Sequence, residues 1–85
     1  MIEFNRLAVG TVIKQLRTKK KLSQEVTSGL AGIARSHLAM IERGTKQANF
    51  ETLWKLANAL EVPPHELVFL IEKEAEAMAE KAPKP

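Results

Sequence analysis

Cysteine, tyrosine and aspartate are absent from this chain of 85 residues, which has two histidines and one tryptophan. Without cysteine there is no disulfide and no thiolate metal site, a composition compatible with a reducing cytoplasm. Two isolated histidines without aspartate or cysteine make no convincing metal-binding set. We therefore expect a cytoplasmic protein with no metal and no cofactor.

Long apolar runs are also missing. No segment approaches the roughly 18–20 apolar residues that a membrane-spanning helix needs, and the opening MIEFNRLAVG lacks the apolar core of a signal peptide. Eighty-five residues can close one modest core but leave little room for a catalytic cleft. Because no nucleophile–base set or carboxylate pair stands out, we expect no enzyme activity, no membrane partner and no small-molecule ligand.

Charge is unevenly distributed along the chain. Residues 1–60 carry ten Lys or Arg and four Glu, a net charge of +6, whereas residues 61–85 carry three Lys and six Glu, a net charge of −3. A basic surface is typical of a polyphosphate binder, but a lysine-rich solvated surface has the same composition. Charge alone leaves both interpretations open.

The first predicted helix spans residues 5–20. Asn5 is the expected N-cap, and Gly10 indicates a close approach to another helix. Four apolar residues form its stripe at near-helical spacing: Leu7, Val12, Ile13 and Leu16. The helix ends in cations that either complement its negative C-terminal end or face a nucleic-acid backbone: Arg17, Lys19, Lys20 and Lys21.

Residues 23–44 predict two short helices joined by a tight turn. Ser23 is the N-cap of the first helix, with Val26 and Leu30 on one face, and Gly32 suits a left-handed turn residue. The second helix spans residues 34–43, with Leu38 and Ile41 inward. Its outward face carries Arg35, Ser36, Ala39 and Met40.

Two further helices complete an all-α fold. Asn49 caps a helix with five apolar residues at helical spacing, namely Phe50, Leu53, Trp54, Ala57 and Leu60. Trp54 is expected in the core or at its edge. Pro64 begins a last helix that continues to about residue 80. We treat residues 1–85 as one domain, with its core at about 5–71 and an extended last helix at about 64–80.

The run from Leu67 to Ile71 is too wide for one face of a helix packed on a small domain. It is either the end of the core or a dimer seam, and we favour both. Leu67 and Leu70 would point inward, while a second copy of the chain would cover Val68, Phe69 and Ile71.

Several motifs in register resemble the XRE family, the lambda-repressor/Cro type of helix-turn-helix regulators. They are LSQE, the glycine turn, ARSHLAMIERG and FETLWKLANALEV, and the resemblance covers about residues 9–70. It implies a five-helix lambda-repressor-like DNA-binding domain whose helix at 34–43 enters the major groove.

The resemblance also implies roles for individual residues. The base-contacting set would be Arg35, Ser36, His37 and Met40. On residue type His37 is more often a plain surface histidine, and its location makes the two interpretations about equal. The DNA-backbone set would be Gln24, Arg43, Lys46 and Gln47. Arg17 and Glu42 would form a structural pair that bridges the first and third helices.

Four residues depart from the family pattern. Thr27 and Ser28 stand where Leu and Ala are usual, Ala34 replaces a capping Ser or Thr, and Ala48 replaces a common Pro. A lost cap costs on the order of 1 kcal/mol. These departures suggest a helix-turn-helix that gains from dimerisation.

We therefore expect a sequence-specific, repressor-like transcriptional regulator that binds a roughly palindromic operator on double-stranded DNA as a homodimer. The alternative is a protein-interaction module, antitoxin-like or coactivator-like, that uses the apolar face of its last helix. The same exposed apolar residues motivate both hypotheses.

Overall fold

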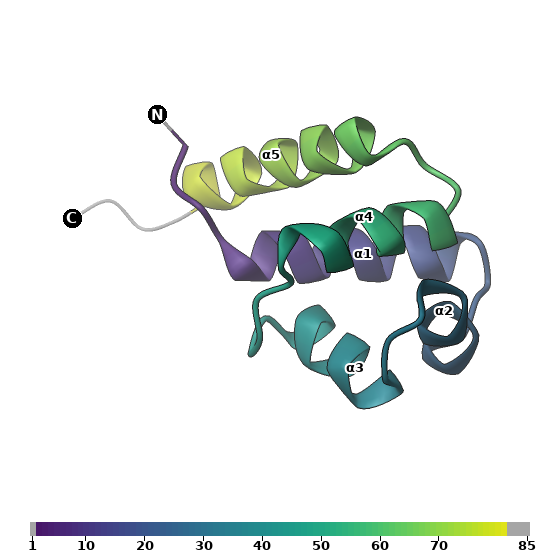
Figure 1. Ribbon diagram of the computed structural model, residues 1–85. Helices are drawn as coiled ribbons and strands as arrows, with labels where there is room; N and C mark the ends of the chain where they lie inside the picture. The colour runs from purple at the N-terminus through teal and green to yellow at the C-terminus, as the bar shows by residue number, and fades with distance from the viewer. Residues whose placement is uncertain (1, 82–85) are drawn as a thin grey trace.

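The computed structural model describes residues 2–81, which form five α-helices and no strand (Figure 1). In chain order the helices are α1 (Arg6–Lys19), α2 (Gln24–Ala31), α3 (Arg35–Arg43), α4 (Phe50–Ala59) and α5 (Pro64–Lys81). The predicted all-α, five-helix fold is confirmed, and the helices predicted at 5–20, 34–43 and 64–80 differ from the observed bounds by single residues. Residues 1 and 82–85 of the predicted domain lie outside the described residues.

α3 and α5 lie on opposite sides of a central layer formed by α1 and α4 (Figure 1). α1 contacts both α3 and α5, whereas α2 contacts α3 and α4. The described part of the chain measures 42 × 23 × 23 Å along its principal axes. The expected DNA-binding helix and the long last helix are therefore available to different partners.

The core lies where four helices meet. Its largest fully buried apolar side chains are Ile13, Leu38, Ile41, Leu56, Leu60 and Leu67, which come from α1, α3, α4, α5 and the residue after α4. Each contributes roughly 1.5–3 kcal/mol of transfer free energy. Leu67 is inward as predicted, and Leu70 is half-buried against the core.

α2 packs through small and polar residues. Thr27, Ser28 and Ala31 are buried, whereas Val26 and Leu30 are 49% and 63% exposed. The face of α2 that carries Val26 and Leu30 is therefore turned largely to solvent, and only Ala31 of its apolar residues packs inward. α2 is rotated so that its small side chains meet α3 and α4, and the Thr27 hydroxyl is buried without a partner among the described residues.

Two other predicted apolar stripes are confirmed in part, because Val12, Ile13, Ala57 and Leu60 are buried and Leu16 and Leu53 pack against the core. On α1 the inward residues are Ala8, Val9, Val12 and Ile13, while Leu7 is 56% exposed and lies over Gly44. On α4, Phe50 and Trp54 are 73% and 49% exposed. Trp54 is thus not a core residue. Thr52, Leu56 and Ala59 turn inward beside the predicted Ala57, so the two aromatic rings lie on the outer flank of α4.

Gly10 marks the close approach of α1 and α3 that its position predicts. A Cβ at residue 10 would lie 2.6 Å from the carbonyl oxygen of Glu42 and closer still to that of Ile41. Because real side chains do not tolerate such contacts with backbone, only glycine allows this helix spacing. The contact brings the last turn of α3 against the middle of α1.

The ends of the helices follow the predicted capping residues. Asn5, Ser23 and Asn49 each accept a hydrogen bond from a backbone N–H in the first turn, at distances of 2.9, 3.0 and 2.7 Å. Ala34 precedes α3 without a side-chain cap, as expected. Gly32 has a φ of 71°, the left-handed conformation that the turn requires.

Candidate nucleic-acid interface

α3 presents a polar outward face. Arg35 and Ser36 are exposed at its first turn, and Met40 is half-buried one turn further on. His37 is also half-buried, and its Nε2 is covered without a hydrogen-bond partner among residues 2–81. Only the other edge of the His37 ring is therefore available for a base contact, whereas Arg35 and Ser36 are fully available.

The two side chains that the family resemblance pairs, Arg17 on α1 and Glu42 on α3, form a bidentate ion pair. Arg17 Nε donates to Glu42 Oε2 at 2.6 Å, and Nη2 donates to Oε1 at 2.9 Å. The side chains are only 11% and 3% exposed. The hydrogen bond to Glu42 raises the pKa of Arg17, burial lowers it, and the charge of Glu42 raises it further, so the net direction is upward.

Arg17 also anchors the chain between α1 and α2. Its Nη1 donates to the carbonyl oxygen of Leu22 at 2.8 Å. One guanidinium thus connects α1, the α1–α2 connection and α3. This arrangement sets the position of α3 relative to the rest of the domain.

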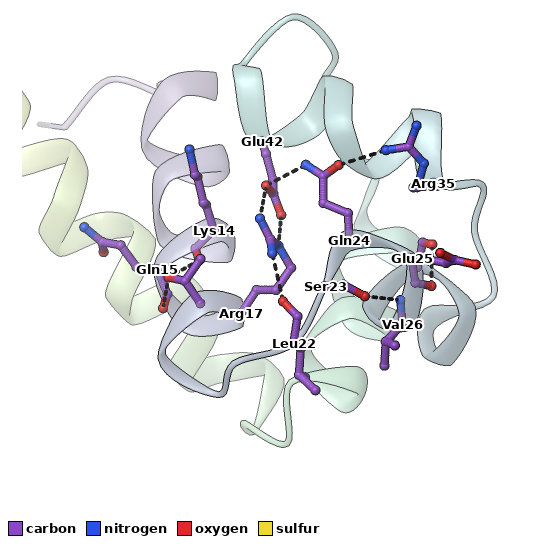
Figure 2. A network of polar contacts seen from close by, with 12 residues as sticks. Lys14, Gln15, Arg17, Leu22, Ser23, Gln24, Glu25, Val26, Arg35 and Glu42 are labelled. Atoms are coloured by element: carbon purple, nitrogen blue, oxygen red, sulfur yellow. Dashed lines mark hydrogen bonds and ion pairs between the residues drawn. The ribbon is translucent and has the colours of Figure 1, made fainter.

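A chain of hydrogen bonds continues from this pair to the outer face of α3 (Figure 2). Gln24 Nε2 donates to Glu42 Oε1 at 3.0 Å, and Arg35 Nη1 donates to Gln24 Oε1 at 3.4 Å. A carboxylate only accepts and a guanidinium only donates, so the amide of Gln24 has a single favourable orientation. Gln24, an expected backbone contact, keeps one free amide hydrogen.

A hollow of about 560 Å³ lies between α1 and the outward face of α3. Its polar lining comprises Lys14, Arg17, Gln24, Arg35, Ser36, Glu42 and Arg43. Because Arg17 neutralises Glu42, three cations remain uncompensated within the hollow. Lys14 is not among the residues predicted from the sequence, although its spacing of three residues from Arg17 places both on one face of α1.

The remaining expected backbone contacts lie at and after the C-terminal end of α3. Gly44 ends the helix with a φ of 77°, and its backbone N–H bonds to Ile41 O at 3.1 Å. Arg43, Lys46 and Gln47 are exposed there. The predicted backbone set is therefore divided between the start of α2 and the end of α3.

The apolar residues expected at a dimer seam lie on two sides of α5. Val68 is 46% exposed and lines a hollow of about 320 Å³ beside Phe50 and Trp54. Ile71 is half-buried against the core and lines the neighbouring hollow beside Phe4. Phe69 is 51% exposed, with the Lys73 ammonium 5.4 Å from its ring centre.

The aromatic part of this apolar surface was not predicted from the sequence. The rings of Phe50 and Trp54 lie 6.0 Å apart with an interplanar angle of 49°, and Phe4 is 65% exposed nearby. The spacing of Phe50 and Trp54, four residues apart on one helix, was visible in the sequence. It indicated an apolar face without indicating whether that face was buried.

Other kinds of site find little support among residues 2–81. No group of three potential metal-ligating side chains occurs there. No described helix is both long and apolar enough to cross a membrane. The described residues instead place several cations and hydrogen-bond donors close together on the outward side of α3.

Comparisons with known proteins agree with this arrangement. A family model described as helix-turn-helix matches residues 13–67. The HTH-type transcriptional regulator y4dJ of Sinorhizobium fredii, itself uncharacterized, is 38% identical over 63 residues, which cover 74% of this chain and 82% of that protein.

Two restriction-modification controller proteins have similar structures. C.AhdI from Aeromonas hydrophila is 39% identical, with a TM-score of 0.71 over 73% of this chain and 94% of that one. C.Esp1396I, solved as a tetramer with its natural operator of 35 base pairs, is 26% identical, with a TM-score of 0.79 over 87% and 97% of the two chains. The present chain belongs to the XRE-type helix-turn-helix family of DNA-binding transcriptional regulators.

Proposed function

We propose that this protein regulates transcription by binding a roughly palindromic operator as a homodimer, with α3 of each copy in the major groove. The observation that carries this proposal is the hydrogen-bond chain from the buried Arg17–Glu42 pair through Gln24 to Arg35. It holds an exposed guanidinium at the start of a helix whose outward face is polar. Such pre-positioning lowers the entropic cost of a specific contact.

The base-reading roles follow from side-chain chemistry. Arg35 can donate two hydrogen bonds to O6 and N7 of a guanine, and Ser36 can donate or accept. Met40 offers only apolar contact, for instance with a thymine methyl group. His37 would contribute through the edge of its ring that remains uncovered.

Backbone contacts would hold α3 in register. Gln24 lies at the positive N-terminal end of α2, while Arg43, Lys46 and Gln47 lie beyond the middle of α3. Phosphate contacts position a protein on the duplex without reading sequence. These four residues would therefore set affinity more than specificity.

Dimerisation would supply a second α3. One recognition helix reaches few base pairs, whereas two-fold pairing presents two helices to half-sites about 34–36 Å apart. The apolar surface formed by Phe4, Phe50, Trp54, Val68 and the half-buried Ile71 supports an interface between copies, and Phe69 is exposed on the other side of α5. α5 lies on the side of the molecule away from α3 (Figure 1).

Selection from random duplexes tests the whole proposal. We expect a two-fold symmetric site with two half-sites in register, and a dimer when the free protein is sedimented. Recovery of sequence-independent binding alone would contradict the proposed function. The cytoplasmic location stays a prediction.

A pair of matched variants tests the interface. Val68→Glu places a charge in the proposed seam and should shift the sedimentation equilibrium to monomer. Val26→Glu introduces the same charge at a similarly exposed valine on α2 and should leave the dimer intact. Equal effects of the two variants would argue against an interface at Val68.

The alternative function is capture of another protein on the same apolar surface. It is favoured by the hollow beside Phe50 and Trp54, which α4 and α5 leave open. A chain that stays monomeric at micromolar concentration and gives no symmetric site in the selection would support this second function.

A further inference from the structure

We propose that the hollow between α1 and α3 receives a phosphate of the DNA backbone, and that Lys14 is the cation that binds it. This inference rests on the proposed function, because it requires a duplex docked on α3. It adds a contact from α1, outside the helix-turn-helix, to those expected from α2 and from the residues after α3.

The charges inside the hollow single out Lys14. Arg17 donates three hydrogen bonds, two to Glu42 and one to Leu22 O, and is held in a buried ion pair. Glu42 accepts from both Arg17 and Gln24. Lys14 is exposed, and its Nζ forms no ion pair within residues 2–81. Its charge is therefore available to an incoming anion.

Lys14 also points to the correct side of the molecule. Lys14 lines the same hollow as Gln24 and Arg35, and Figure 2 shows its side chain extending from α1 on the other side of the Arg17–Glu42 pair from them. Gln24 retains one amide hydrogen after donating to Glu42. A phosphate oxygen in the hollow would meet an ammonium from α1 and an amide donor from the start of α2.

Duplex geometry brings a phosphate to this position. A major groove of about 12 Å holds a helix about 10–12 Å in diameter, so a docked α3 lies between two phosphate backbones. Lys46 and Gln47 follow one end of α3, and the hollow opens along the flank that carries Arg35 and Glu42. The strand on that flank would pass over Lys14, and the opposite strand would meet the residues after α3.

The contact should be electrostatic and insensitive to sequence. Each neutralised phosphate releases condensed counterions, which steepens the dependence of log K on log salt by about 0.9 per contact. Lys14→Gln should shallow that slope by about 0.9, so that it loses about threefold less affinity than wild type between about 50 and 200 mM salt. Lys14→Arg should retain the wild-type slope.

A matched variant controls for net charge. Lys81→Gln removes the same charge at an exposed position at the end of α5, on the side of the fold away from α3 (Figure 1). It should leave the slope unchanged. Thermal unfolding of Lys14→Gln should match wild type because Lys14 is exposed and makes no ion pair. If this variant proves unstable, Lys14→Met provides the same neutralisation with a helix-favouring side chain.

Neutralising single phosphates in the duplex identifies the partner group. Methylphosphonate substitutions are scanned across the selected operator, one linkage at a time. Wild-type protein should lose affinity when one particular linkage flanking each half-site is neutralised. Lys14→Gln should lose no further affinity when the same linkage is neutralised. The affinity ranking of base-substituted operators should be the same for both proteins.

The outcomes separate this inference from the proposed function. If Lys14→Gln keeps both the wild-type salt slope and the full methylphosphonate profile, the phosphate site is refuted, while selection of an operator leaves the proposed function standing. If no operator is selected, the proposed function fails. The salt slopes on random duplex then decide the Lys14 contact independently: a shallower slope supports it, and an unchanged slope refutes it.

Discussion

Glu42 accepts a hydrogen bond from the amide nitrogen of Gln24 at 3.0 Å, while it is also held by Arg17. A buried ion pair is thereby connected to the exposed start of α3. The amide oxygen of Gln24 must then face outward, where it accepts from Arg35. The position of Arg35, the side chain proposed to read bases, thus depends on a carboxylate that is almost fully buried.

Removing the Glu42 carboxylate should lower the stability of the folded protein. Glu42→Ala leaves the guanidinium of Arg17 buried without its partner, and we expect a loss of about 3–5 kcal/mol in the free energy of unfolding. Urea denaturation at fixed protein concentration measures it. The double variant Arg17→Met/Glu42→Leu should recover most of this loss, since apolar pairs often replace buried ion pairs without cost. A double variant as unstable as Glu42→Ala would contradict this account.

Two substitutions of Gln24 should differ in effect. Gln24→Ala removes the acceptor that orients Arg35 and should lower operator affinity while leaving the fold intact. Gln24→Glu should be worse, because it places a second carboxylate beside Glu42 and a negative charge near the DNA backbone. Fluorescence anisotropy with the selected operator compares the three proteins. Better binding by Gln24→Glu than by Gln24→Ala would argue against the proposed orientation.

Contacts with bases and contacts with the DNA backbone should have different effects on binding when their residues are substituted. Arg35→Ala should cost about 1–3 kcal/mol at one base position and relax the preference there. Lys46→Ala should weaken binding to all sequences uniformly. It should also make the slope of log K against log salt shallower by the amount expected for one phosphate contact. The measurement is a matrix of both variants against single-base operator changes. Uniform weakening by Arg35→Ala would remove it from the base-reading set.

Substituting Gly10 should show how closely α1 and α3 pack. In Gly10→Ala the added Cβ would meet the carbonyl oxygens of Ile41 and Glu42, so we expect destabilisation of at least 1–3 kcal/mol as the helices separate. Gly29→Ala is the matched control, because a Cβ there meets nothing within 4 Å. In this helical position it should stabilise by up to about 1 kcal/mol. Similar unfolding midpoints for the two variants would refute the close approach.

The buried Thr27 hydroxyl should lower the stability of the folded protein. It is fully buried and lacks a hydrogen-bond partner among the described residues. Thr27→Val keeps the shape and removes the unpaired group, so we expect a gain of about 1–3 kcal/mol. Chemical denaturation measures the gain, and Ser28→Ala is a control because the Ser28 hydroxyl already donates to Glu25 O at 3.1 Å. A destabilised Thr27→Val would mean that the hydroxyl has a partner in solution.

Local signals in the sequence determined the helices and their ends. Asn5, Ser23 and Asn49 cap through atoms two or three residues away, and Gly32 adopts the left-handed turn by its own conformational freedom. Such features depend only on residues that are close together in the sequence, and they can therefore be predicted from the sequence of one chain. The family resemblance added the pairing of Arg17 with Glu42, which no local pattern contains.

Only the tertiary structure decided which apolar stripes are covered. Phe50 and Trp54 have the spacing of a core face yet lie exposed, because α4 turns smaller residues toward its neighbours. The chain from Arg17 to Arg35 and the hollow beside Lys14 likewise need α1, α2 and α3 in their final positions. Periodicity defines a face of a helix, but the packing of the other helices determines what that face meets.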